Sequence, residues 1–274
     1  MFQPFNESDP ILCAESFLKD EVANNLIHQI SGEDGSLCLK SADGAMLYAQ
    51  TPGRRAWLWC SREVSATRRE ELLKELVLEL SGNALPGVVG EPEVTAAFAE
   101  IYVRAQDVQV IQGMAMTAYH CPVLEQPRAV VGMLRQAVPE DAAVVAEYLA
   151  GFMADAFGST VEPASQLASA EARIGRGDLY LWISEGQPVC MASVSIRTPR
   201  HARIGMVYTP QPLRKNGYAS ALVAGVCSLL LAEGRVPVLY ADVVNPDSNK
   251  VYRSLGFKEC GTVIEFDFGT VQPG

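Results

Sequence analysis

The stretch Val207–Ser220 reads V-Y-T-P-Q-P-L-R-K-N-G-Y-A-S. It predicts the end of a strand, then an R-x-x-G-x-A turn made by Arg214, Gly217 and Ala219, and then an apolar helix over 219–233. Glycine lets the backbone turn tightly and approach a ligand, so the free N–H groups at the start of this helix can converge on an anion. The pattern indicates a phosphate-binding turn, in which a Cβ at position 217 would project toward the phosphates.

A second pattern follows that helix. A strand is predicted over 236–244, and the residues from Tyr240 to Phe257 read Y-A-D-V-V-N-P-D-S-N-K-V-Y-R-S-L-G-F. Asn245 before a proline is an ordinary helix N-cap or turn residue, so a helix is expected after it. Either pattern alone is common in α/β proteins, whereas both together, at the spacing of one crossover, are specific.

The two patterns resemble the coenzyme-A-binding core of the GCN5-related N-acetyltransferase (GNAT) family. Its signature is [RQ]-x-x-G-x-[GA], a helix, a strand, and N-x-x-[SA]-x-x-x-Y-x-x-x-G-F, matched here by Asn245, Ser248, Tyr252, Gly256 and Phe257. The resemblance implies an N-acetyltransferase that transfers acetyl from acetyl-coenzyme A directly to a primary amine of a small molecule or peptide in a ternary complex. A non-catalytic coenzyme-A-binding sensor or scaffold is the alternative.

The resemblance also implies which residues bind the cofactor. Main-chain groups of the strand before the turn would hold the pantetheine arm and the acyl carbonyl, and the turn would hold the pyrophosphate. A solvated turn is the alternative for the side chains of Arg214 and Lys215. The implied residues are Met206, Val207, Tyr208, Arg214, Lys215, Asn216, Gly217, Tyr218, Ala219 and Asn245.

Tyr252 corresponds to the proton donor of that family for the coenzyme A thiolate. A phenol with a pKa near 10 can protonate a thiolate whose conjugate acid has a pKa near 8.5 with a modest mismatch. The alternative is a tyrosine whose ring packs in the core. No motif identifies a general base, and Asp155, Glu162 and Asp242 are the candidates.

We expect an α/β (α+β) protein of two GNAT-like domains, each with a mixed, mostly antiparallel central sheet flanked by helices. The predicted domains are 1–122 and 128–274, with the boundary in C-P-V-L-E-Q-P-R at 121–128. The first domain is interpreted as a degenerate repeat of the catalytic second domain, because its elements follow the same order. An unrelated accessory domain is the alternative.

The first half opens with an amphipathic helix, predicted from Phe17, Leu18, Val22, Leu26 and Ile30. Strands are then predicted at 36–40, 45–50 and 55–60, followed by a helix over 66–81. The junction before that helix reads S-R-E-V-S-A-T-R-R-E and has no glycine turn. We therefore expect that the first half does not bind coenzyme A in this way.

Composition limits the remaining possibilities. The chain has 274 residues, 49% of them hydrophobic, and no run approaches the roughly 18 apolar residues of a membrane span. Its start lacks the features of a signal peptide, so a cytoplasmic protein without a membrane partner is expected. The 7 cysteines and 3 histidines are dispersed, which favours core cysteines and no metal site.

Charge makes nucleic acid an unfavourable partner. The formal net charge is −10, with 9 Lys and Arg against 18 Asp and Glu in residues 1–127 and 13 against 14 in residues 128–274. An acidic chain without basic clusters is repelled by phosphates and attracts cationic substrates, although acidity can also serve solubility alone. The oligomeric state is open between monomer and homodimer.

Overall fold

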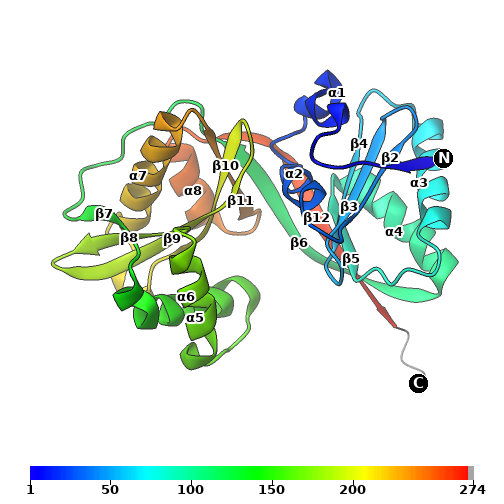
Figure 1. Cartoon of the computed structure of the whole chain (residues 1–274). Helices are drawn as coiled ribbons and strands as arrows, with labels where there is room; N and C mark the ends of the chain where they lie inside the picture. Colours follow the sequence, from blue (N-terminus) through cyan, green and yellow to red (C-terminus); the bar gives the residue numbers. More distant parts are fainter. Residues whose placement is uncertain (271–274) are drawn as a thin grey trace. The chain divides into compact units, whose positions relative to one another are not determined.

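The computed structural model describes residues 1–270, which form two compact units (Figure 1). Unit 1 contains residues 1–119 and 241–244 and the chain from 259 onward, and unit 2 contains residues 120–240 and 245–258. The last strand of the chain is therefore part of the first unit.

Unit 1 is built on a mixed sheet with the strand order β1-β2-β3-β4-β5-β12-β6. Neighbouring strands from β1 to β4 pair antiparallel, β4 and β5 pair parallel, and β12 pairs antiparallel with β5. The strands are β1 (Phe2–Pro4), β2 (Leu37–Ser41), β3 (Met46–Gln50), β4 (Ala56–Cys60), β5 (Gly87–Gly90), β6 (Val108–His120) and β12 (Lys258–Thr270). The helices are α1 (Glu15–Leu18), α2 (Leu26–Ser31), α3 (Ala66–Glu79) and α4 (Pro92–Gln106), with a 3₁₀ turn at Pro10–Cys13.

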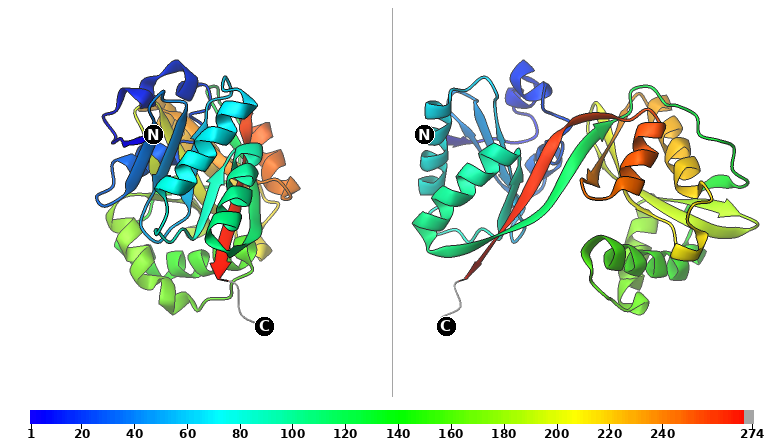
Figure 2. Two further views of the ribbon diagram at one scale, coloured as in Figure 1. Left: turned by 90° about the vertical axis from the view of Figure 1, so that its right-hand side faces the viewer. Right: turned by 180° about the vertical axis from the view of Figure 1, so that it is seen from behind.

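The core of unit 1 lies between this sheet and the helices α3 and α4, which lie side by side (Figure 2). Leu72 and Leu76 recur at helical spacing on α3, so both face the sheet and are fully buried. Phe98 of α4 packs beside them and stacks on Tyr102 with ring centroids 5.7 Å apart. The expected helix over 66–81 is thus confirmed to within two residues.

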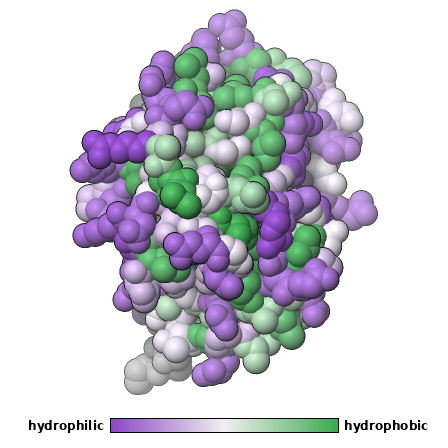
Figure 3. Space-filling model, turned by 90° about the vertical axis from the view of Figure 1, so that its left-hand side faces the viewer, coloured by the Kyte–Doolittle hydropathy of each residue, from purple (hydrophilic) through white to green (hydrophobic). Residues whose placement is uncertain are grey.

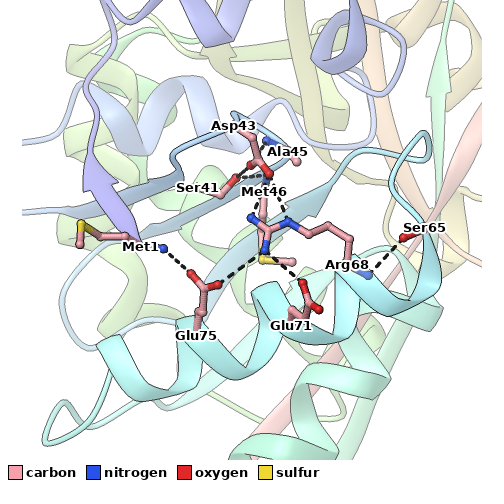
Figure 4. A network of polar contacts seen from close by, with 9 residues as sticks. All are labelled: Met1, Ser41, Asp43, Ala45, Met46, Ser65, Arg68, Glu71 and Glu75. Atoms are coloured by element: carbon pink, nitrogen blue, oxygen red, sulfur yellow. Dashed lines mark hydrogen bonds and ion pairs between the residues drawn. The ribbon is translucent and has the colours of Figure 1, made fainter.

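The N-terminus of α3 is closed by its own side chains. Ser65 Oγ accepts a hydrogen bond from the Arg68 backbone N–H at 3.2 Å. The Arg68 guanidinium in turn lies 3.0 Å from Asp43 Oδ2 and also faces Glu71 and Glu75 (Figure 4). The Ser65 side chain therefore satisfies one of the free backbone N–H groups at the start of α3.

The prediction of one opening helix is wrong, because the segment forms two short helices, α1 and α2, joined by turns. Asp20 interrupts the helix: its carboxylate binds Arg62 at 2.9 Å and accepts from Trp59 Nε1 at 3.2 Å. Asn24 Nδ2 donates to the Asp20 carbonyl at 2.9 Å, and Asn25 makes a similar local bond. Such side chains compete with helical backbone bonds, and the hydrophobic pattern does not reveal this.

Unit 2 has the strand order β11-β10-β9-β8-β7. Strands β7 to β10 pair antiparallel with their neighbours, and β10 and β11 pair parallel. The strands are β7 (Met133–Gln136), β8 (Leu179–Ser184), β9 (Gln187–Arg197), β10 (His201–Tyr208) and β11 (Val236–Asp242). The helices are α5 (Ala142–Phe157), α6 (Leu167–Gly175), α7 (Tyr218–Ala232) and α8 (Pro246–Ser254), with 3₁₀ turns at Pro139–Asp141, Pro163–Gln166 and Gln211–Leu213.

The two units share one plan. Each begins with a strand and two helical segments, continues with three antiparallel strands, and crosses by a helix, α3 or α7, to a parallel strand followed by another helix. The expected fold class, two domains with mixed and mostly antiparallel sheets, is confirmed. In unit 2, α5 and α6 cover the sheet and bury Val145 and Leu149 against Leu181 and Met191.

Candidate functional site

Strands β10 and β11 part in the middle of unit 2. Their parallel ladder runs over three pairs, from His201 with Val236 to Arg203 with Val238, and β10 then continues to Tyr208. The register of β10 against β9 also shifts between Gly205 and Tyr208, which makes a β-bulge at Met206 and Val207. Main-chain groups of the bulge lie outside both ladders and can bind an extended ligand.

The backbone is strained both at the bulge of β10 and in the turn that follows β10. Met206 and Lys215 have φ angles of 52° and 65°, and they are two of the four non-glycine residues with positive φ in residues 1–270. Gly217 has φ 82° and is the N-cap of α7, with no side-chain hydrogen bond to the helix. The start of α7 is thus open, unlike that of α3, and its free N–H groups and positive dipole end can accept an anion.

Arg214 is held in this turn by the protein itself. Its Nε donates to the Thr209 carbonyl at 2.9 Å, and its Nη2 forms an ion pair with Asp155 of α5. Asn216 closes the turn by donating from Nδ2 to the Leu213 carbonyl at 3.1 Å. Any phosphate that binds Arg214 must therefore compete with Asp155.

Gly217 faces a segment that the sequence patterns did not connect with it. A Cβ at Gly217 would lie 2.9 Å from Cγ2 of Val130, in the segment of unit 2 that precedes β7. The same segment is fixed further on, where Trp182 Nε1 donates to the Val131 carbonyl at 3.3 Å. The neighbour that a larger residue at 217 would meet in this structure is thus Val130, and no sequence signal near Gly217 indicates this contact.

Tyr208, at the end of β10, is packed against α5. Its ring lies 5.7 Å from that of Tyr148, and a Cβ at Gly151 would collide with the Tyr208 hydroxyl. Burial raises the pKa of Tyr208, with a smaller contribution from the negative charge of Asp155. Gly151 therefore makes room on α5 for the strand that carries the bulge.

Asn245 begins α8 as expected. Its Oδ1 accepts from the Ser248 N–H at 3.1 Å, and its carbonyl accepts from Asn249 Nδ2 at 2.7 Å. Within residues 1–270, its own Nδ2 makes no hydrogen bond, and the side chain is exposed. The cap role is therefore filled, and Nδ2 remains available for a ligand.

Tyr252 is buried on α8, 7% exposed, and its ring makes an edge contact with Phe257 at 5.8 Å. Burial raises its pKa above the ordinary value of 10, and the nearby Cys190 adds to this shift. Cys190 Sγ accepts from the Thr209 hydroxyl at 3.1 Å, so Tyr252 and the end of β10 share one neighbour. The phenol therefore stays protonated and shares the neighbour Cys190 with the start of the turn after β10. The end of this turn and the start of α7, residues 214–219, are the candidate phosphate cradle.

The three candidate bases have different surroundings. Asp155 is paired with Arg214, Glu162 is exposed before a 3₁₀ turn, and Asp242 Oδ1 accepts from the Val244 N–H at 3.0 Å. The contact of Asp155 with Arg214 joins it to the turn after β10. No group of three His, Cys, Asp or Glu side chains in residues 1–270 is arranged to hold a metal ion.

Elsewhere in unit 2, hydrophobic side chains reach the surface among polar ones (Figure 3). Val131 and Met133 are 79% and 63% exposed, close to the edge strand β7. An open hollow of about 570 Å³ lies between β7 and the last turn of α7, lined by residues that include Leu134, Tyr180 and Leu229. It is at the opposite end of α7 from the cradle. Among the described residues, no helix is both long enough and apolar enough to cross a bilayer.

Comparison with known proteins supports the expected family. Residues 180–264, from β8 into β12, match the family model described as FR47-like protein. A GNAT-family acetyltransferase from Colwellia psychrerythraea is 12% identical and has a TM-score of 0.57, with 98% of this chain and 100% of that chain covered. No curated protein matches the sequence.

Two further solved structures agree. The GCN5-related N-acetyltransferase of Sphaerobacter thermophilus is 16% identical with a TM-score of 0.62, covering 100% of this chain and 96% of that chain. The one of Kribbella flavida is also 16% identical, with a TM-score of 0.56 and coverages of 95% and 97%. The chain thus has the GNAT fold over its whole length, and the resemblance stated from the sequence is confirmed.

Proposed function

We propose that this chain of GNAT fold is an N-acetyltransferase that transfers acetyl from acetyl-coenzyme A to a primary amine of a small molecule or peptide. One contrast supports the proposal most: the crossover helix of unit 1 is capped by Ser65, whereas that of unit 2 starts at Gly217 with no side-chain cap. An open helix start after a turn with positive φ is suited to a pyrophosphate.

Different residues of unit 2 would bind different parts of acetyl-coenzyme A. The N–H groups from Arg214 to Ala219 would take the pyrophosphate, with charge from Arg214 and Lys215. The bulge at Met206 and Val207, next to Tyr208, would hold the pantetheine arm and the thioester carbonyl by main-chain bonds, and Asn245 Nδ2 would reach the same arm. Binding in this way holds the thioester rigidly for attack.

In the reaction, the amine nitrogen forms a bond to the thioester carbonyl carbon and the carbon–sulfur bond breaks. The departing thiolate takes a proton from Tyr252, and the amine loses one to solvent or a base. The Tyr252 phenol is protonated at neutral pH and can donate to the thiolate, and because burial raises its pKa it is a weaker acid than a free phenol. Transfer is direct, because both substrates are bound at once.

The test is the release of free thiol from acetyl-coenzyme A across a panel of primary amines, with coenzyme A binding measured by calorimetry on the same protein. We expect binding, and thiol release with a subset of amines. Thiol release should disappear in Gly217→Glu, whose side chain would fill the cradle, and persist in Gly234→Glu at the other end of α7, where a Cβ has open space.

Binding without turnover for every amine would instead indicate a non-catalytic coenzyme A sensor or scaffold. Absence of binding in the folded wild-type protein would contradict both functions. Gel filtration with light scattering on the same sample would decide between monomer and homodimer, and equilibrium dialysis against a mixed metal panel would test the expectation of no metal.

A further inference from the structure

Arg203 lies where β10 and β11 part. It forms the last pair of their ladder, with Val238, and its guanidinium carbon is 4.6 Å from the centre of the Tyr240 ring. Tyr240 is two residues beyond Val238 on β11, so its side chain is on the same side of the sheet as that of Arg203. The cation and the ring therefore lie together at the apex of the opening between the strands.

The guanidinium of Arg203 has no counter-ion. Within residues 1–270 it makes no hydrogen bond and no ion pair, and the tyrosine ring is its one partner. Burial lowers its pKa from the usual value. Arg203 is half-buried, and a ring face attracts a cation but accepts little from the five N–H donors of arginine, so these donors remain available to a ligand.

Other arginines of unit 2 show what Arg203 lacks. Arg135 donates from both terminal nitrogens to Asp141, at 2.8 and 2.9 Å, and Arg214 is paired with Asp155. A guanidinium binds a carboxylate in this bidentate way because both groups are planar, and two N–H donors align with the two carboxylate oxygens. The donors of Arg203 have the same shape, but among residues 1–270 no carboxylate pairs with them.

Other charged and titratable groups lie on the same strands as Arg203 or next to them. His201 is two residues earlier on β10, on the same side of the strand. The pKa of His120 is lowered by burial and, to a lesser extent, by the positive charges of His201 and Lys258, so these basic groups are neighbours. By the same two-residue spacing, Asp242 follows Tyr240 on this side of β11, so charges of both signs lie near Arg203.

We propose that Arg203, stacked on Tyr240, is the receptor for a carboxylate group carried by one of the two substrates of the transfer. This inference rests on the proposed function. In the proposed function the thioester would lie beside Met206. Met206 is three residues beyond Arg203 on β10, which is about 10 Å in an extended strand. A carboxylate a few bonds from the reacting centre would therefore fit, either on an amino-acid acceptor or on a dicarboxylic acyl group.

The test compares substrates in pairs. Acceptors are an amino acid and the amine left by its decarboxylation, and donors are acetyl- and succinyl-coenzyme A. For the carboxylated member that the receptor binds, we expect Arg203→Gln to lower kcat/KM about 10- to 100-fold, mostly through KM, and Arg203→Lys to restore part of it. For the uncarboxylated member, the change should stay below about 2-fold.

The pair that responds identifies the source of the carboxylate, acceptor or acyl group. Equal effects of Arg203→Gln on both members of both pairs would overturn the proposal. Circular dichroism checks folding, and if Arg203→Gln does not fold, Tyr240→Leu is used, which removes the ring but keeps the charge, and the same selective loss is expected.

Calorimetry separates this inference from the proposed function. If thiol release fails with every amine, the binding of the same carboxylated and uncarboxylated compounds to wild-type protein and Arg203→Gln is measured directly. Selective loss of the carboxylated compound in Arg203→Gln supports the receptor even when the transferase proposal has failed. Binding that is unchanged by Arg203→Gln overturns the receptor.

Discussion

Gly217 combines two requirements, a positive φ and a close neighbour. Gly217→Ala should weaken coenzyme A binding about 10-fold or more, because a Cβ strains the turn and meets Val130 Cγ2 at 2.9 Å. The matched control is Gly234→Ala, which has φ 75° but open space, so it carries the strain alone. Calorimetry should show near wild-type affinity for Gly234→Ala.

Val130→Ala in the Gly217→Ala background isolates the contact with Val130. If affinity returns fully, the close contact caused the loss and the turn needs no glycine for its ligand. If affinity stays low, the Cβ interferes with the ligand itself. An unchanged affinity in Gly217→Ala alone would contradict the cradle.

Tyr252→Phe tests proton donation. The variant should keep its affinity for acetyl-coenzyme A and lose turnover by about 10²- to 10⁴-fold if thiolate expulsion limits the rate. Because burial raises the pKa of Tyr252, the wild-type rate should show no alkaline fall from this group below pH about 10. A pH–rate profile on the responsive amine checks this, and loss of cofactor binding would instead assign Tyr252 a packing role.

Arg203 and Tyr240 were not identified as site residues from the family signature. The signature residues from Arg214 to Phe257 could be located from spacing alone, because the family pattern is local in the sequence. Arg203 is on a strand whose partner, β11, is brought beside it only by the crossover through α7. Val130 is equally unpredictable from local sequence, because its contact with Gly217 depends on the path of the segment before β7.

At the scale of elements, periodicity predicted the strands and long helices and missed the break between α1 and α2. Leu18 is the clearest indication, since the helical face would bury it whereas it is 37% exposed. Burial patterns report which face a helix would use. They do not report whether Asn24 and Asn25 bind backbone carbonyls, or whether Asp20 binds side chains outside the helix.

The turn between β2 and β3 is tied to α3 by Asp43. The Ser41 hydroxyl donates to it at 2.6 Å and, with Arg68, holds its pKa at about 2 instead of 3.8. A lowered folded pKa contributes stability above the unfolded value, and this stability is lost as the pH falls from about 4 to about 2. Asp43 is partly exposed, so we expect about 0.5–1 kcal/mol.

Asp43→Asn should therefore destabilise unit 1 at pH 7 and progressively less toward pH 2. Urea unfolding at several pH values measures the difference in free energy from the wild type. A Trp182→Phe background restricts the fluorescence to Trp57 and Trp59, which are both buried in unit 1. A difference that is the same at every pH would contradict the assignment.

At the scale of the whole molecule, each unit has its own hydrophobic core and its own tryptophan residues, but the chain segments of the two units alternate along the sequence. Strand β12 pairs with β5 from Ile264 with Gly90 to Asp267 with Gly87, and Arg55 binds Asp267 through two nitrogens at 2.6 and 2.8 Å. No local pattern predicts that the last strand joins the first sheet, because pairing between distant strands leaves no trace in periodicity.

A chain that ends at Phe257 should therefore lose unit 1 first. Without β12, strand β5 becomes an open edge of the sheet. We therefore expect unit 1, followed by the fluorescence of Trp57 and Trp59, to unfold at a lower denaturant concentration, and the truncated protein to aggregate. Trp182, in a variant lacking the other two tryptophans, should still report cooperative unfolding of unit 2. Asp267→Asn, which keeps the strand, should cost about 1 kcal/mol at most. Equal losses in both units would contradict this.

The place of β12 also sets the order in which the protein can be completed during synthesis. Residues 1–119 leave the ribosome before any of unit 2, yet their sheet receives β12 only when residues 259–270 emerge. Unit 2 is complete at residue 258, so the unit that is translated second can finish folding first. Until then, β5 of the nascent chain has an unpaired edge, and this is the interval in which a chaperone would be most useful.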